Sequence, residues 1–312
     1  MNVLLPALTA TAHAAAHPAG GTCRCAIAGA VLAERDDDAA VVRHGDTVAK
    51  AHTPGTGPGE LALRLATAVR LPGVLLAPLR PEPVTLHGRL VTFWPYGTPV
   101  DPGAPEAAPW KAAAALLARL HRAPAPAGLP PMRGPAKAAR AVERLRAAGP
   151  HPATEPVLRA WAALPAWARA EAPAPSARTL CHGDLHLGQL VRHPADTGGW
   201  LLIDVDDLGV GDPAWDLARP AAWYACGLLP PDEWSRFLSA YREEGGPAVP
   251  STGDPWPVLD VPARALTVQT AALAVAKSVL AERPLDEVEQ AVVDACVRMG
   301  AIPREFAHEG AQ

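Results

Sequence analysis

The sequence predicts an α+β protein with a small β-rich N-terminal part and a larger, mainly helical C-terminal part. Its 312 residues exceed the ~100–200 residues of a typical single domain. Short β-type runs separated by turn residues precede residue 93, and helical periodicity dominates from residue 110. We therefore expect a β-rich N-terminal part over 1–93, a linker over 94–109 and a helical part over 110–312.

The composition indicates a globular protein without a nucleic-acid or membrane partner. Charged residues make up 19% of the chain and AVILMFWYC residues 49%, which is typical of folded proteins. The formal net charge of -4 gives no general attraction to nucleic acids or anionic lipids. No uninterrupted apolar run approaches the ~18–20 residues of a membrane helix. We expect a small-molecule partner, and the composition leaves open whether the protein is a monomer or a homodimer.

The cysteines and the N-terminal segment favour a cytoplasmic protein. The five cysteines are an odd number without CxxC or Cys/His ligand spacing, which indicates reduced thiols. Cys23 and Cys25 would share one face of a strand, where core or surface thiols are expected rather than a metal pair. The apolar opening over 1–17 is similar to a signal peptide, but it lacks a positively charged start and contains Pro6 and His13.

The N-terminal part predicts a β-meander, a helix and a hairpin. The helix is predicted because Leu61, Leu65 and Val69 recur at near-helical spacing before Pro72. The expected elements are three strands within 26–52 that turn at Asp36–Asp38 and at 44–46, a helix over 60–70, and a hairpin over 83–94 that turns at His87 and Gly88.

The C-terminal part predicts helices interrupted by one hairpin. A Pro- and Gly-rich linker over 94–109 precedes a helix in which Trp110, Ala113, Leu117 and Leu120 share one face. The further expected elements are helices near 135–148, 154–172, 213–226, 231–244, 257–282 and 285–299, and two strands at 189–193 and 200–204.

The stretch "HGDLHLGQLVRHPADTGGWLLIDVDD" carries the chemistry. Asp184 lies in a loop before the first strand of the hairpin, and Asp204 follows the second, so we expect both carboxylates to lie close together. Two close carboxylates require a cation or a shifted pKa. Mg²⁺ takes oxygen ligands from carboxylates and phosphates. The spacing therefore predicts a metal–phosphate site.

The same stretch matches the spacing of a protein-kinase catalytic loop, which has a His two residues before the catalytic Asp and a metal-binding amide five residues after it. His182, Asp184 and Gln189 stand in this order, and Asp204 takes the place of the second metal-binding Asp. We expect Asp184 to be the general base. Gln189 and Asp204 are expected to hold Mg²⁺ on the phosphates of ATP, and His182 to orient the loop.

A phosphate-binding cation is also expected from the β-rich part. Kinases supply a Lys on the third strand that pairs with a Glu on the following helix. Lys50 lies on the third expected strand, and Glu60 begins the next helix. Lysine is scarce in this chain, so the position of Lys50 is informative.

These motifs resemble the aminoglycoside phosphotransferase and choline kinase family of small-molecule kinases. The resemblance rests on "HGDLHLGQL", on "LIDVDDLGVGDPAWDLA" and on "LLARLH" over 116–121, and it covers roughly residues 40–225. It implies a two-lobed protein-kinase-like fold. It also implies the following roles: Asp184 as catalytic base, Gln189 and Asp204 as Mg²⁺ ligands, Lys50 as phosphate contact with Glu60 as its partner, and the backbone around Trp94 and Tyr96 as adenine contact.

Two features depart from the family pattern. Most members have Asn where this chain has Gln189, and the Gln variant is similar to bacterial maltokinases and glucosamine kinases. Gln retains the carbonyl ligand, so activity is expected to survive. The first turn, "ERDDDA", is also acidic rather than Gly-rich.

Several residues allow two interpretations. Asp206 and Asp207 could assist metal binding, face a cationic acceptor or form a polar turn. Asp212 and Asp216 are expected to support a helix N-terminus. Four aromatic residues could stack on a sugar, although helix aromatics more often belong to the core: Trp215, Trp223, Tyr224 and Trp234.

The expected function is an ATP- and Mg²⁺-dependent phosphotransferase acting on a hydroxyl of a sugar, amino sugar or aminoglycoside. A choline or homoserine kinase is the related alternative. A metal phosphohydrolase would have no use for Lys50 and Glu60. A degenerate kinase-fold binding module is suggested by Gln189 and the missing Gly-rich loop, but the presence of Asp184 and Asp204 argues against it.

Overall fold

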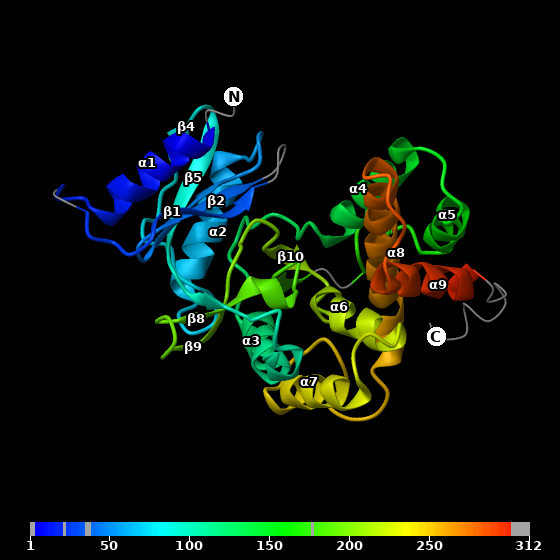
Figure 1. Ribbon diagram of the computed structural model, residues 1–312. Helices are drawn as coiled ribbons and strands as arrows, with labels where there is room; N and C mark the ends of the chain where they lie inside the picture. The colour runs from blue at the N-terminus through cyan, green and yellow to red at the C-terminus, as the bar shows by residue number, and fades with distance from the viewer. Residues whose placement is uncertain (1–3, 21–22, 35–38, 176–177, 301–312) are drawn as a thin grey trace. The chain divides into compact units, whose positions relative to one another are not determined.

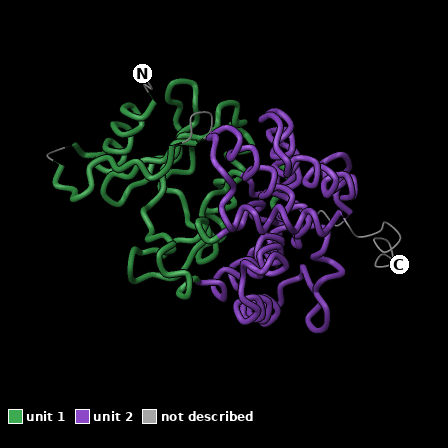
Figure 2. Tube along the Cα trace, turned by 45° about the vertical axis from the view of Figure 1, so that its right-hand side comes forward, with its two compact units in different colours: residues 1–108, 126–130, 187–206 green, residues 109–125, 131–186, 207–312 purple. Residues whose placement is uncertain are grey.

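The computed structural model describes residues 4–20, 23–34, 39–175 and 178–300 (Figure 1). The expected turn at Asp36–Asp38 lies outside these residues. The chain forms two compact units (Figure 2). Unit 1 contains residues 1–108, 126–130 and 187–206, and unit 2 contains residues 109–125, 131–186 and 207–312.

Unit 1 is built around a five-stranded antiparallel sheet with the strand order β1-β2-β3-β5-β4. The predicted meander and hairpin are confirmed, and the hairpin turns where His87 and Gly88 both have positive φ. The strands are β1 (Ala28–Glu34), β2 (Ala40–His44), β3 (Thr47–Ala51), β4 (Val84–Leu86) and β5 (Arg89–Pro95).

Two α-helices lie in the described part of unit 1. Helix α1 (Leu4–Ala16) was not predicted; its buried residues Leu8 and Ala12 form one core with Val42 and Phe93 of the sheet. The predicted second helix is confirmed as α2 (Pro58–Arg70). Leu61 and Leu65 are buried as expected, whereas Val69 is 50% exposed. The buried face of α2 is therefore narrower than the spacing of these three residues predicted.

A second, three-stranded sheet of unit 1 has the order β6-β8-β9, with β6 (Thr98–Pro99), β8 (Leu190–His193) and β9 (Gly199–Leu202). The predicted hairpin is therefore present. Because β6 pairs with β8 and Leu75 forms a bridge with Leu202, the hairpin and residues 94–108 belong to unit 1. This division differs from the expected boundaries at 93 and 109. The unit also contains two short 3₁₀ helices, η1 (Pro105–Ala107) and η2 (Leu187–Gln189).

Unit 2 is mainly helical. A two-stranded antiparallel ladder joins β7 (Thr179–Cys181) to β10 (Gly209–Gly211). The helix expected over 154–172 ends at Ala162, three residues before Pro165. The helices are α3 (Trp110–Arg122), α4 (Gly134–Ala148), α5 (Thr154–Ala162), α6 (Ala214–Ala225), α7 (Pro231–Glu243), α8 (Trp256–Leu280) and α9 (Glu287–Gly300).

Helix α8 is the core helix of unit 2. Among the described residues it is the one helix long and apolar enough to cross a membrane, with a mean hydropathy of 1.3 over its most apolar stretch. That stretch is 67% buried within the protein, and the helix packs against α4, α6 and α9. Its apolar surface is therefore covered by other helices, as in the core of a globular protein.

Candidate active site

In unit 1, Lys50 joins two acids that follow β9. Its Nζ lies 2.6 Å from Asp204 Oδ1 and 2.9 Å from Asp206 Oδ2, and its side chain is only 11% exposed. Burial alone would lower the pKa of Lys50, but the two carboxylates outweigh it and raise the pKa. Lys50 therefore carries a buried positive charge that Asp204 and Asp206 balance. Asp204 lies 154 residues away from Lys50 in sequence.

A chain of polar contacts fixes Asp206. The indole Nε1 of Trp94 donates to Thr92 Oγ1 at 2.9 Å, and Thr92 Oγ1 lies 2.8 Å from His52 Nε2. His52 Nδ1 lies 2.7 Å from Asp206 Oδ1. Burial would raise the pKa of Asp206, but Lys50 and His52 hold it well below its usual range.

The hairpin joins the chain segments that carry Gln189 and Asp204. The backbone carbonyl of Gln189 accepts a hydrogen bond from the N–H of Ile203 at 2.9 Å, so position 189 lies across the ladder from the residue before Asp204. Gln189 is 8% exposed. The Asp204 side chain is 32% exposed, and its backbone has a φ of 65°, a left-handed conformation that Asp tolerates better than most residues.

The predicted Lys50–Glu60 pair is wrong. Glu60 is 57% exposed in the first turn of α2, where its Oε2 lies 3.4 Å from Nη1 of Arg64 one turn later. That spacing brings i and i+4 side chains together on a helix. Lys50 finds its counter-charges in Asp204 and Asp206 instead.

The predicted adenine contacts lie at the end of β5. Trp94 is buried, and its indole N–H donates a hydrogen bond to the Thr92 hydroxyl. The Tyr96 N–H donates to the Asp46 carbonyl at 2.7 Å, and the Tyr96 carbonyl lies 3.0 Å from His193 Nδ1. Both backbone groups of Tyr96 thus have partners within unit 1, and adenine recognition by this segment stays a prediction.

In unit 2, two cations hold the carboxylate of Asp184. Oδ2 lies 2.5 Å from Nζ of Lys137 on α4, and Oδ1 lies 3.1 Å from Nη2 of Arg219 on α6. Burial would raise the pKa of Asp184, but Lys137 and then Arg219 lower it to about 2. The carboxylate is therefore ionised at neutral pH and held in one orientation.

Asp216 fixes the loop that carries Asp184. Its buried carboxylate accepts hydrogen bonds from the backbone N–H groups of His182 at 2.6 Å and Gly183 at 2.7 Å. His121 Nε2 lies 2.9 Å from the same carboxylate, and His121 Nδ1 lies 2.7 Å from the Tyr241 hydroxyl. Asp216 thus has a structural role as expected, but the backbone amides that it binds belong to the loop that carries Asp184 and not to its own helix.

Gly183 and Asp207 complete this loop. Gly183 has a φ of +85°, and a Cβ at this position would lie 2.4 Å from the backbone oxygen of Asp207. The Asp207 carboxylate lies 2.8 Å from Arg133 Nε and 2.7 Å from Lys137 Nζ. Lys137 therefore bridges two acids, Asp184 and Asp207, and the loop requires glycine at position 183.

Sequence reasoning missed the cations around Asp184 because no motif contains them. Lys137 lies on α4, which is rich in Ala and Arg, and Arg219 lies on α6, which is rich in Ala. A signal was available in the scarcity of lysine, since the chain has only four lysines and two of them hold site acids. Beside Asp184 lies a small pocket lined by Lys137, Gly183, Asp184, Leu185, Trp215, Arg219, Leu266 and Gln269.

Comparisons with known proteins give the family of this chain. The profile of the phosphotransferase enzyme family matches residues 29–256. A comparison with curated proteins finds no significant match.

Solved structures give the fold. A choline/ethanolamine kinase family protein from Mesorhizobium loti superposes with a TM-score of 0.59 at 18% identity, covering 96% of this chain and 98% of that one. A spectinomycin phosphotransferase solved with ADP and spectinomycin gives 0.57 at 14% identity, with coverages of 91% and 93%. An aminoglycoside phosphotransferase solved with AMP-PNP and hygromycin B gives 0.57 at 16% identity, with coverages of 88% and 94%.

The expected fold is thereby confirmed: a β-rich N-terminal part and a helical C-terminal part of the protein-kinase-like type. The family match spans the lysine of β3, the loop that carries Asp184 and the acids after β9. The chain therefore belongs to the phosphotransferase enzyme family.

Proposed function

We propose that the protein is an ATP- and Mg²⁺-dependent kinase that transfers a phosphoryl group to a hydroxyl of a small polar molecule. The observation that carries the proposal is the contact of Lys50 with Asp204 within unit 1. It joins a phosphate-binding cation to an acid suited to a metal ion, which is the pair that phosphoryl transfer requires. The solved relatives with ADP or AMP-PNP support a nucleotide as donor.

The residues around Asp204 fit Mg²⁺. The Asp204 carboxylate is partly exposed, and Gln189, which lies across the ladder from the residue before Asp204, would add an amide oxygen. Oxygen ligands from one or two side chains, completed by phosphate and water, are what Mg²⁺ prefers. Asp204 and Gln189 would hold the ion, which when bound neutralises charge on the transferred phosphate.

Lys50 is preset to receive phosphate. Its ammonium is shared between two carboxylates, and phosphate oxygens would compete with Asp204 for it. Asp206 would remain in place because His52 also holds it. Lys50 thus keeps its orientation through Asp206 while Asp204 becomes free for a metal ion.

Asp184 would accept the hydrogen bond of the acceptor hydroxyl and finally its proton. Lys137 and Arg219 keep the carboxylate ionised and fix its direction. A pKa of about 2 makes it a weak base. This suits a loose transition state, in which positioning of the hydroxyl contributes more than early proton removal.

The pocket beside Asp184 favours an acceptor without multiple positive charges. Arg133, Lys137 and Arg219 surround the two acids Asp184 and Asp207, so cations exceed anions among these five side chains. A polycationic aminoglycoside would be repelled by the excess cation. Among sugars, amino sugars and aminoglycosides, we therefore propose a neutral sugar as the preferred acceptor.

The test is ATP turnover with Mg²⁺ against a panel of neutral sugars, amino sugars, aminoglycosides, choline and homoserine. The expected result is ADP formation that depends on one acceptor class and on Asp184. Nucleotide binding without turnover on any acceptor would instead favour a binding module. Turnover only with polycationic acceptors would contradict the proposed preference.

A further inference from the structure

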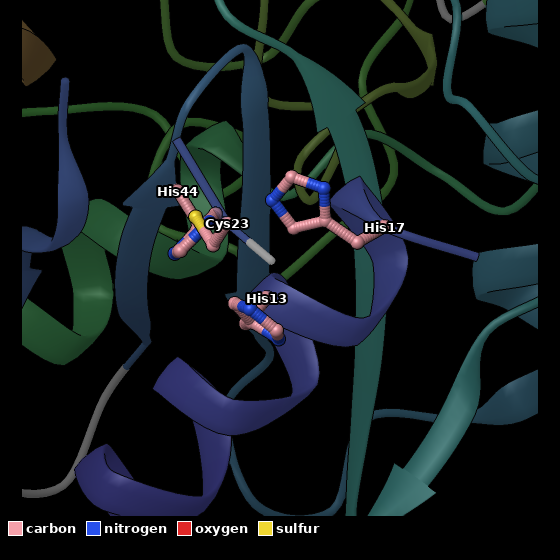
Figure 3. Close-up of side chains that lie close together, drawn as sticks. All are labelled: His13, His17, Cys23 and His44. Atoms are coloured by element: carbon pink, nitrogen blue, oxygen red, sulfur yellow. The ribbon is translucent and has the colours of Figure 1, made fainter. Parts of the chain in front are cut away.

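A second group of reactive side chains lies in unit 1, apart from the residues of the candidate active site. His13, His17, Cys23 and His44 gather where the end of α1 meets β2 (Figure 3). One ligand atom from each, a ring nitrogen or the thiol sulfur, lies within 4.8 Å of all the others. None of the roles described above uses these side chains.

The local structure explains why these residues meet. His13 and His17 are one helical turn apart, and the His17 N–H donates to the His13 carbonyl at 3.0 Å. Residues at i and i+4 lie on the same face of a helix. On β2, Val42 packs in the core shared with α1, and His44 lies two residues later on the same face of the strand. Packing of α1 on the sheet therefore brings the three imidazoles together.

The distances approach those of a tetrahedral metal site. The ring centroids lie 4.9 Å apart for His13 and His17, 4.7 Å for His13 and His44, and 5.3 Å for His17 and His44. Cys23 Sγ lies 3.2 Å from His44 Nε2. Tetrahedral Zn²⁺ with Zn–N near 2.0–2.1 Å and Zn–S near 2.3 Å places ligand atoms about 3.3–3.6 Å apart. Small side-chain rotations would reach this spacing.

Cys25 contacts two of the four side chains of this group. The backbone N–H of Cys25 lies 3.5 Å from Cys23 Sγ, and the Cys25 thiol lies 3.4 Å from His17 Nε2. Groups that contact metal ligands in this way orient them.

We propose that His13, His17, Cys23 and His44 bind a structural Zn²⁺ ion that ties α1 to the sheet of unit 1. Three imidazoles and one thiolate fill the four tetrahedral positions, and a site with four protein ligands leaves no position for catalysis. Cys23 would then be a metal ligand and Cys25 its neighbour, in contrast to the free thiols expected from their spacing in sequence.

The other Cys/His/Asp group of the described residues does not suit a metal. His121, Cys181 and Asp216 are also close together, but both ring nitrogens of His121 are already matched by Tyr241 and Asp216. The Asp216 carboxylate also accepts two backbone hydrogen bonds. This group is explained by the support of the catalytic loop.

The first experiment measures metal content of the untagged full chain, purified without a metal column. After equilibration with Zn²⁺ and gel filtration, we expect one Zn²⁺ per chain in the unaltered protein. Cys23→Ser and His13→Gln should lower the affinity for Zn²⁺ at least 10-fold, since even loss of a group that only supports a ligand costs that much. Cys226→Ser and His151→Ala, which alter a cysteine and a histidine outside the group, should leave it unchanged.

A second measurement stays informative if a variant fails to fold. Co²⁺ in the unaltered protein should give the visible bands of a tetrahedral ion and a thiolate charge-transfer band that survives Cys25→Ser. Chelation of Zn²⁺ should lower the melting temperature by roughly 2–4 °C or more. Absence of bound Zn²⁺ and of the thiolate band would overturn the proposal. Binding that is insensitive to both Cys23→Ser and His13→Gln would show an adventitious ion only and would overturn it as well.

Discussion

Lys137 Nζ lies 2.5 Å from Asp184 Oδ2 and 2.7 Å from Asp207 Oδ2, so one ammonium links the proposed base to the acid against which Gly183 packs. The Lys137 side chain is 25% exposed, and the side chains of Asp184 and Asp207 are less exposed. It orients Asp184 while lowering its basicity. The proposed kinase thus relies on a carboxylate fixed in direction rather than on a strong base.

Asp184→Asn should abolish transfer and leave nucleotide binding nearly intact, because the carboxylate acts on the acceptor hydroxyl. Removal of a general base typically costs ~10²–10⁴ in turnover. Steady-state kinetics with the acceptor found by screening, together with calorimetry of a non-hydrolysable ATP analogue, would measure both effects. Asp294→Asn on α9 is the matched control. Unchanged turnover in Asp184→Asn would reduce Asp184 to a structural acid.

Lys137→Gln should raise the pKa of Asp184, because Lys137 is the larger of the two charges that lower it to about 2. A carboxyl group whose pKa is depressed in the folded state stabilises the protein above its unfolded pKa and loses that contribution as pH falls. For Asp184 the loss runs from near pH 4 down to about pH 2 and amounts to about 2 kcal/mol. Acid-induced unfolding followed by circular dichroism should therefore begin at higher pH in Lys137→Gln. Coincident acid transitions would contradict the role of Lys137.

Asp204→Ala should remove the Mg²⁺-dependent part of nucleotide affinity, because the proposed ion would lose its only anionic protein ligand. Calorimetry with AMP-PNP, with and without Mg²⁺, measures this difference. Glu60→Ala is the matched control: Glu60 is exposed and contacts Arg64, so affinity should not change. Equal losses of Mg²⁺-dependent affinity in Asp204→Ala and Glu60→Ala would contradict the proposed role of Asp204 and would support the Lys50–Glu60 pair.

Gly183→Ala should destabilise the protein more than Gly227→Ala. Both glycines have positive φ, but a Cβ meets the Asp207 backbone at 2.4 Å in the first case and nothing within 4 Å in the second. A left-handed backbone at a residue other than glycine costs about 1–3 kcal/mol of stability. Gly227→Ala should lose this amount, and Gly183→Ala should lose more because its Cβ also clashes with Asp207. Urea unfolding of both variants gives the comparison. Equal costs would mean that the loop relaxes freely around position 183.

The strands and the catalytic motifs were predictable because they depend on local signals. The hairpin at His87 and Gly88, the strand of Lys50 and the hairpin that joins Gln189 to Asp204 follow from turn residues and period-two patterns. Helix α1 was missed because its alanine-rich sequence has few large apolar residues, and only packing against Val42 and Phe93 shows which face it buries.

The partners of the site residues were less predictable because they depend on tertiary distance. Lys50 was assigned to Glu60, its nearest acid on the next helix, whereas the fold brings Asp204 to it from the distant hairpin. Similarly, Cys23 has no ligand spacing in sequence with His44, and only the packing of α1 places them 3.2 Å apart. Long-range charge pairing leaves no periodic pattern that a sequence could reveal.

Gln189 separates an active kinase from a degenerate binding module. If its carboxamide oxygen is a metal ligand, Gln189→Asn should retain part of the activity because the same oxygen persists about one methylene short. Gln189→Leu should lose nearly all of it, since an apolar branch cannot replace an oxygen donor for Mg²⁺. Turnover as a function of Mg²⁺ concentration distinguishes a metal ligand from a residue that only packs. A weakened metal ligand raises the Mg²⁺ concentration that the enzyme requires before it lowers the maximal rate. Gln290→Leu on the exposed face of α9 is the matched control. A harmless Gln189→Leu would mean that this buried side chain serves only the packing of the hairpin, and it would favour the binding module.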